Sequence, residues 1–477
     1  MFITIKFGGT SVGDAGRIRK AAELVAAEVA AGHKVVVVTS AMTGVTNKLV
    51  ALVQAKPGPP VEEQTRVMEF FHFTKELEQK HIQTARECIS NPKLVDETAN
   101  TLYSERHALE RVLLGAHFLG EDQIQEGTIG YDFVVSQGER LCVPILANCL
   151  RDLGVDAAAV GSEGCGIMTD SNYGNARPLE PQTRNGVRQT LLPLINTGKT
   201  PVAGGFYGRS PQGRYATLGR GGSDYSATLV GAALDCDEIW IMTDVDGIKT
   251  TDPRVVPSAR AIDEMPYMIA AEMALLGAKV LHPKSVLPAA KQDIPLRVAS
   301  SFEPAKPGTR LVPTRPGTGP GVAGLTLVRK AGLICMTTAH LGDKGVIPAA
   351  MIDDIRRNNT DILASSSASN GSSVLWLVGP LDLERFLSIV EQRKDPHVQA
   401  EIRRDVAVLG IVGEQAARAP GILARVANCL EQVGAQPLAW LQGASPNSIA
   451  IALPDDDEKL PAMMRALHST FGLDKGA

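Results

Sequence analysis

Two short apolar runs with a helical stretch between them constrain the fold of this chain more than any other feature. Residues 2–7 and 34–39 have the apolar, β-branched character of buried strands. Between them, residues 13–32 carry apolar side chains at helical spacing, namely Ile18, Ala21, Ala22, Leu24, Val25, Ala26 and Val29. Strands joined across a helix lie parallel, and helices cover a parallel sheet. The start of the chain therefore predicts a layered α/β unit.

The alternation of helix and strand continues further along the chain. Strand-like runs occupy residues 157–160, 200–203 and 238–243, and a helix-like stretch precedes each of them. Such a pattern is typical of one sheet with helices packed on it. We therefore predict that residues 1–312 form a single α/β domain.

The composition indicates a folded soluble protein with a large core. The chain has 477 residues, of which 44% are hydrophobic and 21% charged. A net charge of -4 and a pI near 6.2 leave no basic surface for nucleic acid or an anionic membrane. A phosphate group would therefore meet a local pocket rather than a charged face.

The cysteines and the N-terminus predict a cytoplasmic protein. Seven cysteines are scattered without a Cys-x-x-Cys pair or a His-Cys cluster at metal-ligand spacing, which favours buried free thiols and predicts no metal site. The N-terminus has neither the basic and apolar regions of a signal peptide nor the Arg- and Ser-rich character of a transit peptide. The longest apolar stretches are shorter than a membrane span.

A polar segment at residues 61–120 interrupts the α/β pattern. It is rich in Glu, Gln, Lys, His and Leu and has no β character. We predict a helical insertion, most simply a hairpin that packs on the sheet. Whether it closes a substrate pocket or forms dimer contacts stays open.

A Pro- and Gly-rich stretch at residues 303–321 predicts a linker, which we place at residues 313–324. Behind it, a strand, helix, strand, strand order occurs twice. The first copy spans residues 325–378 with a helix near 347–357. The second spans residues 406–453 with a helix at 420–433, and a further helix follows Asp457. We predict two βαββ modules, at residues 325–400 and 401–477.

The first chemically informative cluster is Lys6-Phe-Gly-Gly-Thr-Ser11, directly after the first strand. Its glycines let the backbone approach an anion, and amides at a following helix start would donate to it. Lys6, which we expect to end an accessible loop rather than a core strand, would add a positive charge for a phosphoryl group. The sequence contains no Walker loop. Taken alone, the cluster is more simply a strand-to-helix turn.

The second cluster, Gly219-Arg-Gly-Gly-Ser-Asp224, is another glycine turn before a helix. Arg220 could bind a carboxylate with two parallel hydrogen bonds, and Asp224 could hold an ammonium group or orient a cation. A local ion pair between the two explains the same residues, and both interpretations stay open for this cluster alone.

Two further clusters lie at the ends of predicted elements. Residues 243–254, Thr-Asp-Val-Asp-Gly-Ile-Lys-Thr-Thr-Asp-Pro-Arg, follow an apolar strand, where ligands bind in open α/β sheets. Their spacing does not fit an EF-hand, so nucleotide and Mg²⁺ binding is the better interpretation. In Ser136-Gln-Gly-Glu-Arg140, Glu139 could bind an amino group, although alone it is more simply a helix-capping residue.

Together these clusters closely resemble aspartate kinase, of the amino acid kinase family. The matching segments are residues 6–12, Ser40-Ala-Met-Thr-Gly-Val-Thr-Asn47, residues 136–140, 219–224 and 243–254, and Gly277-Ala-Lys-Val-Leu-His-Pro283. They span nearly all of the predicted first domain. The resemblance implies a three-layer domain with a mainly parallel sheet, followed by two ACT-like modules that bind amino acids such as lysine or threonine.

The rear modules resemble paired ACT domains unevenly. Residues 419–425 fit the usual loop-to-helix start, whereas residues 343–347 fit it loosely and residues 365–370 replace the familiar strand-edge pattern. In the family the second module is inserted within the first. The resemblance also implies a homodimer or a dimer of dimers.

The implied reaction is transfer of the γ-phosphoryl group of ATP, with Mg²⁺, to the side-chain carboxylate of L-aspartate. This is the first step toward lysine, threonine and methionine. A carboxylate with a pKa near ~4 is already ionised at neutral pH, so positioning and charge neutralisation remain as the tasks. By resemblance, Arg220 binds the substrate α-carboxylate, Glu139 and Asp224 lie near its ammonium group, and the pocket is lined by Ser40, Thr46 and Ser223.

The same resemblance assigns the phosphate and nucleotide contacts. Lys6, Gly8, Gly9 and Ser11 would contact the phosphoryl group, with Lys6, Gly9 and Asp224 as the catalytic set. The nucleotide would be held by Thr243, Asp244, Lys249, Arg254 and Lys279. Lys249 stands where family members often carry Tyr. Related kinases for uridylate, acetylglutamate or carbamate are the nearest alternatives, and an inactive amino-acid sensor is a more distant one.

Overall fold

The computed structural model describes residues 1–54, 63–161, 164–278, 280–313, 321–338, 351–355, 358, 360–369, 372–393, 397–442 and 445–475. The chain divides into two compact units, residues 1–247 with 284–313 and residues 248–283 with 314–477. Residues 248–283, predicted as part of the first domain, therefore group with the C-terminal unit. The reason is local pairing, since the amide of Leu325 donates to the carbonyl of Thr250 at 2.8 Å.

The first unit is built on a mainly parallel sheet with strand order β3-β4-β2-β1-β7-β9-β10. The strands are β1 (Phe2–Phe7), β2 (Lys34–Thr39), β3 (Ala157–Ala159), β4 (Thr200–Gly204), β7 (Glu238–Thr243), β9 (Leu296–Ser300) and β10 (Thr309–Val312). All neighbours pair in parallel except β9 and β10. The strands predicted from apolar runs are thus confirmed. The Pro- and Gly-rich stretch contains β10, however, because residues 309–311 pair with β9.

Helices cover the two faces of this sheet. In β1, Ile3, Ile5 and Phe7 join the core that contains α1 (Ala15–Ala30) and α6 (Gln137–Asp152). The alternate residues Thr4 and Lys6 face α8 (Gly222–Ala233) instead. This alternation gives the three-layer arrangement predicted from the sequence. The unit also contains α2 (Val45–Gln54), α5 (Ile129–Val135), α7 (Glu180–Asn196), α10 (Pro283–Ala290), the short helices η1 (Gly9–Val12) and η2 (Glu121–Ile124), and the β-hairpin of β5 (Tyr207–Arg209) and β6 (Tyr215–Thr217).

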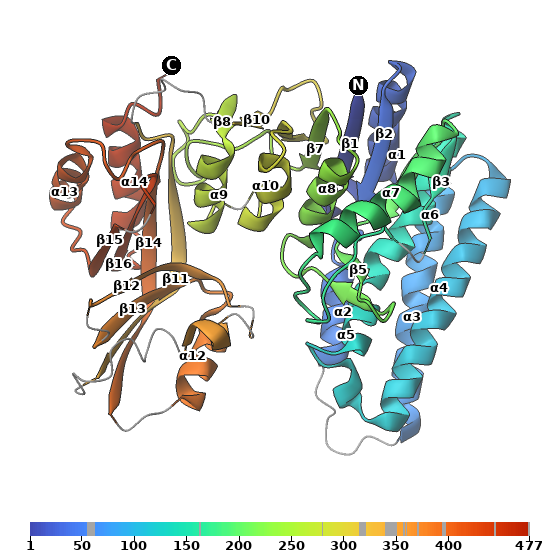
Figure 1. Cartoon of the computed structure of the whole chain (residues 1–477), viewed down its shortest axis with the longest axis horizontal. Helices are drawn as coiled ribbons and strands as arrows, with labels where there is room; N and C mark the ends of the chain where they lie inside the picture. Colours follow the sequence, from blue (N-terminus) through green and yellow to red (C-terminus); the bar gives the residue numbers. More distant parts are fainter. Residues whose placement is uncertain are drawn as a thin grey trace. The chain divides into compact units, whose positions relative to one another are not determined.

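The predicted helical hairpin is present as α3 (Glu63–Cys88) and α4 (Pro92–Leu119), which lie side by side in Figure 1. Asn91 begins α4 by accepting a hydrogen bond from the amide of Lys93 at 3.0 Å. The hairpin packs on α1 and α6 rather than on the sheet as predicted. Those helices already cover the apolar side of the strands, so the hairpin adds an outer helical layer.

The second unit contains an antiparallel sheet with strand order β12-β13-β11-β14-β16-β15. Its two longest strands, β11 (Gly324–Thr338) and β14 (Val398–Val412), pair along their length with a register shift between Val328 and Leu333. The other strands are β12 (Ile362–Ser367), β13 (Ser373–Val378), β15 (Ala439–Gln442) and β16 (Ser448–Pro454), and β8 (Glu264–Pro266) lies earlier in the chain. The helices are α9 (Tyr267–Leu275), α12 (Leu383–Gln392), α13 (Ile422–Gln432) and α14 (Lys459–Thr470), with a further helical turn at residues 351–355.

Two hydrophobic cores divide this sheet between two modules. One core combines the second half of β11 with β13 and α12, through Ile334, Trp376 and Phe386. The other combines the first half of β11 and the second half of β14 with α13 and α14, through Leu325, Leu409, Val426 and Met463. The core around Ile334, Trp376 and Phe386 therefore lies between the two chain segments that build the other core. The module predicted as first is thus inserted within the second, which is the reverse of the order expected from the family.

The predicted division at residues 400 and 401 falls inside β14, because both modules share that strand. The helices predicted at residues 420–433 and after Asp457 are confirmed as α13 and α14. Most of the helix predicted near residues 347–357, and residues 343–347 of the loosely matching loop, lie outside the described residues. No described helix is long and apolar enough to cross a membrane.

Candidate active site

The loops that carry the predicted site residues leave the sheet at one edge. Phe7 of β1 is in register with Thr39 of β2 and with Met242 of β7. Thr39 in turn pairs with Gly204, and Thr243 pairs with Ser300. Because these strands are parallel, their carboxyl ends lie together, which is where open α/β sheets bind ligands.

The glycine loop after β1 is held against the end of β7. The amide of Gly8 donates to the carbonyl of Met242 at 3.0 Å, and the Ser11 hydroxyl contacts the same carbonyl at 3.3 Å. Ser301 Oγ donates to Ser11 Oγ at 2.7 Å. At Gly9, an added Cβ would lie 3.0 Å from the carbonyl oxygen of Ala41, so a side chain there would press on the neighbouring loop. The loop is thus fixed close to Thr243.

Lys6 occupies a different position from the one predicted. It lies within β1, in the middle of the sheet, and its side chain is only 9% exposed. The expectation that it ends an accessible loop is therefore wrong, since β1 continues to Phe7. The Lys6 ammonium group forms an ion pair with the carboxylate of Asp224 in the first turn of α8. This pair places a cation directly beneath the glycine loop, where Lys6 Nζ would lie 3.5 Å from a Cβ added to Gly8.

Glu139, in the first turn of α6, is buried beside this ion pair. Burial raises the pKa of Glu139 to about 8, and hydrogen bonds from the Ala41 amide and the Ser223 hydroxyl together with the positive charge of Lys6 oppose that shift. Four of the predicted residues, Lys6, Glu139, Ser223 and Asp224, are therefore neighbours in the folded chain. Lys6, Glu139 and Asp224 are ionisable groups in a largely buried place, which is typical of functional sites.

The start of α6 packs tightly on the loop after β2. A Cβ added to Gly138 would lie 2.6 Å from the Ala41 Cβ and 3.5 Å from Thr46 Oγ1. The amide of Ser40 donates to the carbonyl of Phe7 at 3.1 Å. Ser40 and Thr46 are therefore brought close to Gly138 and to the loop after β1.

Arg220 lies in an exposed turn just before α8. The turn depends on glycine, because Gly219 and Gly221 have φ angles of 71° and 66°. Lys284 supports it by donating to the carbonyl of Leu218 at 3.1 Å and to Asn175 Oδ1 at 2.9 Å.

Buried Asp132 supports the strand that leads into this turn, and no motif in the sequence pointed to it. Its carboxylate accepts hydrogen bonds from the Thr217 amide and hydroxyl, both at 2.7 Å, and from the Gly174 amide at 2.9 and 3.0 Å. Burial raises the pKa of Asp132 to about 6 despite these bonds. Asp132 and Lys284 together fix the backbone of Thr217 and Leu218, directly before Gly219.

The predicted nucleotide residues divide between the two units. Thr243 ends β7 and Asp244 follows it, and Thr243 Oγ1 donates to Asp244 Oδ1 at 3.1 Å. Lys249 and Arg254 belong to the second unit, where exposed Arg254 pairs with Asp252 at 2.7 Å. Lys279 lies outside the described residues. The nucleotide roles of these three residues stay predictions.

All seven cysteines are free thiols, as predicted, and six of them are buried. Within the described ranges, no three His, Cys, Asp or Glu side chains gather as the ligands of a metal ion would.

Comparison with known proteins identifies the class that this fold and site define. The chain belongs to the amino acid kinase family, whose model matches residues 1–300. The resemblance to aspartate kinase seen in the sequence is confirmed by relatives that match over their full length. Lysine-sensitive aspartokinase 3 of Escherichia coli is 30% identical over 98% of this chain and 99% of its own length. The aspartate kinase of Pseudomonas putida is 29% identical over 100% of this chain and 98% of its own.

Solved structures give the same result. Aspartokinase III of E. coli in complex with aspartate and ADP, described as the R-state, matches with a TM-score of 0.81 and 28% identity over 98% of this chain and 99% of that one. The same enzyme in complex with lysine and aspartate, described as the T-state, matches with a TM-score of 0.72 and 29% identity over 99% of both chains.

Proposed function

We propose that this protein is an aspartate kinase that transfers the γ-phosphoryl group of ATP to the side-chain carboxylate of L-aspartate. The observation that carries the proposal is the grouping of Lys6, Glu139 and Asp224 at the carboxyl edge of the sheet. It occurs in a chain that aligns over its full length with aspartokinases. The product is 4-phospho-L-aspartate, an acyl phosphate at the start of lysine, threonine and methionine synthesis.

The reaction requires that the substrates be positioned and that negative charge be neutralised, and it does not require a general base. An oxygen of the aspartate carboxylate, already ionised at neutral pH, attacks the γ-phosphorus as the bond to the leaving ADP oxygen breaks. Lys6, held in a rigid strand, would neutralise negative charge on the transferred group without having to reorganise. The amides of the glycine loop, with Gly8, Gly9 and Ser11, would border the same group.

Substrate recognition follows from the residues around Lys6. Glu139 and Asp224 would receive the substrate ammonium group, Arg220 its α-carboxylate, and Ser40, Thr46 and Ser223 would line the pocket. Binding an ammonium group favours the ionised form of Glu139 and so compensates for the burial that now raises its pKa. A substrate that carries both charges satisfies this set, whereas uridylate or carbamate does not.

ATP would lie along the end of β7, with Thr243 and Asp244 nearest, and Lys249, Arg254 and Lys279 are proposed to complete the nucleotide site. Mg²⁺ usually keeps several waters and binds through phosphates and one or two carboxylates. The exposed Asp244 carboxylate fits that requirement. When bound with ATP, Mg²⁺ supplies charge neutralisation on the phosphates.

The second unit is proposed to be regulatory. The E. coli relative is named as lysine-sensitive, and its structure has been solved with lysine. We propose that lysine or threonine binds the paired modules at residues 325–477, and that the protein works in the cytoplasm as a homodimer or a dimer of dimers. Titration of lysine and threonine into the kinase assay tests the regulation.

The direct test is a panel of acceptors. ADP formation is measured with ATP and Mg²⁺ and, in turn, L-aspartate, N-acetyl-L-glutamate, carbamate or uridylate. The proposal expects ADP release that depends on L-aspartate. Release that depends on another acceptor would redirect the proposal within the family, and no release with any of them would refute it in favour of an inactive sensor.

A further inference from the structure

A loop outside the sequence motifs, residues 170–177, lies against the turn that carries Arg220. The shape of this loop is fixed from within, because the amides of Asn172 and Arg177 donate to Asp170 Oδ1 at 3.1 and 3.0 Å. Hydrogen bonds from an aspartate side chain to the backbone further along the chain are typical of tight turns. The loop therefore presents a defined surface to its neighbours.

This loop contacts both the strand and the turn that lead to Arg220. The amide of Ala176 donates to the carbonyl of Thr217, the last residue of β6, at 2.8 Å. A Cβ added to Gly219 would lie only 2.7 Å from Asn175 Oδ1. Because Gly219 has no side chain, the loop lies directly against the backbone of the turn.

Fully buried Asp132 joins the loop to β6. One oxygen of its carboxylate, Oδ2, accepts hydrogen bonds from the amides of Gly174 and Thr217 at 2.9 and 2.7 Å. The other oxygen, Oδ1, accepts from the Thr217 hydroxyl at 2.7 Å and from the same Gly174 amide at 3.0 Å. Loss of the carboxylate would leave the buried Thr217 amide without this acceptor, which is costly, and would release the loop from the strand.

Lys284 of α10 supports the same place from a second helix. Its ammonium group donates to Asn175 Oδ1 at 2.9 Å and to the carbonyl of Leu218 at 3.1 Å. Lys284 thus binds the loop and the backbone just before Gly219 at the same time. Arg220 is the residue after Gly219, so its backbone position is set by ionisable side chains on two helices, α5 and α10.

We propose that Asp132 and Lys284 are positioning residues that hold Arg220 in place for the α-carboxylate of L-aspartate, with the loop of residues 170–177 as the link between them. The inference rests on the proposed function, in which Arg220 binds that carboxylate. A guanidinium group forms two parallel hydrogen bonds with a carboxylate only when both groups have the right orientation. Once its backbone is released, Arg220 must be ordered at the moment of binding, and that cost lowers the affinity.

The two supports should affect one kinetic constant selectively. The reacting phosphoryl group and ATP are proposed to meet other residues, among them Lys6 and Thr243. Loss of a support should therefore raise the KM for L-aspartate and leave kcat and the KM for ATP within about twofold of the unchanged protein. A general disturbance of the fold would alter all three constants.

The first test is Lys284→Met in the full chain, with ADP release measured against the concentration of each substrate. We expect the KM for L-aspartate to rise about 5- to 10-fold. Lys291→Met is the matched control, because Lys291 follows α10, pairs with Glu180 and is 60% exposed, and it should alter none of the three constants. An unchanged KM for L-aspartate in Lys284→Met would overturn the proposal.

Two changes at Asp132 separate its hydrogen bonds from its charge. Asp132→Ala removes the acceptors, and the KM for L-aspartate should rise about tenfold. In Asp132→Asn the side-chain oxygen can accept from the two backbone amides while the side-chain NH2 group donates to the Thr217 hydroxyl, so the KM should stay within about threefold of the unchanged protein. A KM in Asp132→Asn as high as that in Asp132→Ala would contradict support through these hydrogen bonds.

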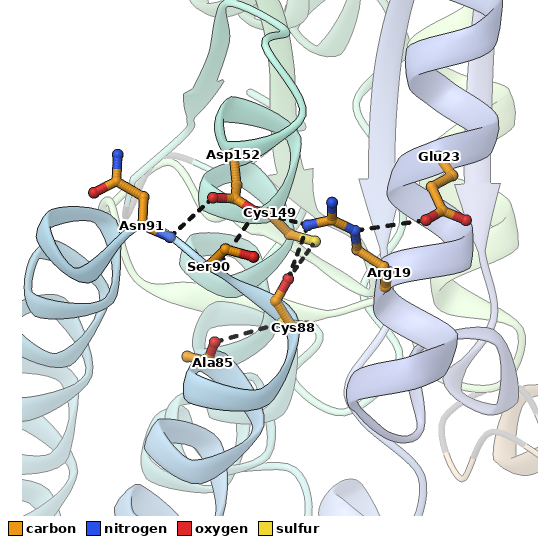
Figure 2. A network of polar contacts seen from close by, with 8 residues as sticks. All are labelled: Arg19, Glu23, Ala85, Cys88, Ser90, Asn91, Cys149 and Asp152. Carbon is orange, nitrogen blue, oxygen red and sulfur yellow. Dashed lines mark hydrogen bonds and ion pairs between the residues drawn. The ribbon is translucent and has the colours of Figure 1, made fainter.

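Asp152 provides the matched control for Asp132→Ala (Figure 2). Its side chain is 7% exposed and accepts hydrogen bonds from the amides of Ser90 and Asn91 at 3.1 and 3.0 Å and from Arg19 at 2.7 Å. It is the last residue of α6, at the end of the helix away from the proposed site. Asp152→Ala should lower stability but, per folded molecule, leave the KM for L-aspartate unchanged. An equal rise in KM for the two variants would show a general effect of losing a shielded carboxylate and would overturn the proposal.

A double variant shows whether the supports act through Arg220. Adding Lys284→Met to Arg220→Ala should raise the KM for L-aspartate by less than about twofold, because the contact that Lys284 supports is already lost. Full multiplication of the two separate effects would overturn the proposal. Absence of aspartate-dependent ADP release from the unchanged protein would instead contradict the proposed function, and this inference with it.

Discussion

The Lys6 ammonium group in the central strand β1 forms an ion pair with the Asp224 carboxylate at the start of α8. The Lys6 and Asp224 side chains are 9% and 15% exposed. A charge held this firmly is oriented before a substrate arrives, which is the condition for electrostatic stabilisation of a transferred phosphoryl group.

Lys6→Ala should lower turnover by about 10²- to 10³-fold, because a positioned charge at the transferred group is lost. The change also leaves Asp224 without its cation, and we expect a loss in the free energy of unfolding of about 1–3 kcal/mol. Turnover should therefore be normalised to the folded fraction, measured by circular dichroism. Near-normal turnover in the folded variant would remove Lys6 from the mechanism.

Glu139 should make aspartate binding depend on pH. Burial raises its pKa to about 8, so in the substrate-free protein it ionises across the range from about pH 7 to about pH 9. Because the ionised form binds an ammonium group, kcat/KM for L-aspartate should rise across this range and then level off. Glu139→Gln should lower kcat/KM and abolish the rise, and a rise that persists in the variant would assign it to another group.

The same shift has a consequence for stability with a definite sign. The folded pKa lies above the usual value of 4.5, so folding favours the neutral form of Glu139. The contribution of this shifted pKa to the free energy of unfolding is fully present below about pH 4.5. It is lost as the pH rises through about 8. The free energy of unfolding, measured by urea denaturation, should therefore fall between about pH 6 and about pH 9 in the unchanged protein. In Glu139→Gln the fall between the same two pH values should be smaller.

Arg220→Ala should raise the KM for L-aspartate by about 10- to 100-fold, which corresponds to the loss of a hydrogen-bonded contact with a charged group. The KM for ATP should stay unchanged. Arg214→Ala, in the exposed turn between β5 and β6, is the matched control and should alter neither constant. An equal rise in both KM values for Arg220→Ala would indicate a disturbed fold rather than a lost substrate contact.

Glu105→Ala should destabilise the first unit by about 3 kcal/mol, because it removes the ion-pair partner of a buried guanidinium. Arg140, on α6, pairs with Glu105 of α4 and lies over the Tyr215 ring at 4.7 Å, with its side chain only 8% exposed. Glu97→Ala is the control on the same helix. Its pair with Arg151 is exposed, so its loss should cost under about 1 kcal/mol. Equal losses for the two variants, measured by urea denaturation, would contradict this account of how the hairpin is attached.

Much of the first unit could be predicted from local patterns because strands such as β2 and β7 are short, mainly apolar runs. The point at which β1 ends was harder to predict. Phe7 closes β1, so Lys6 lies in the sheet, but the glycines that follow suggested a loop. The partnership of Lys6, Asp224 and Glu139 joins residues more than 80 positions apart and is visible only in the folded chain.

In the second unit, the way in which the two modules share strands could not be predicted from the sequence. A repeated strand and helix order predicts two modules but cannot show that both use β11 and β14. The boundary between modules lies within long strands, near Lys330 and Asp405, which have φ angles of 55° and 57°. Asp132 was missed for a related reason, since its hydrogen-bond partners Gly174 and Thr217 lie in other parts of the chain.

The most direct test of the central claim is to trap the acyl phosphate. The protein is incubated with ATP, Mg²⁺, L-aspartate and hydroxylamine, and the acyl hydroxamate is measured, with Lys6→Ala as the control. The account predicts aspartyl hydroxamate that requires both ATP and L-aspartate and is nearly absent with the variant. No hydroxamate from L-aspartate, with the protein folded and ATP present, would contradict it.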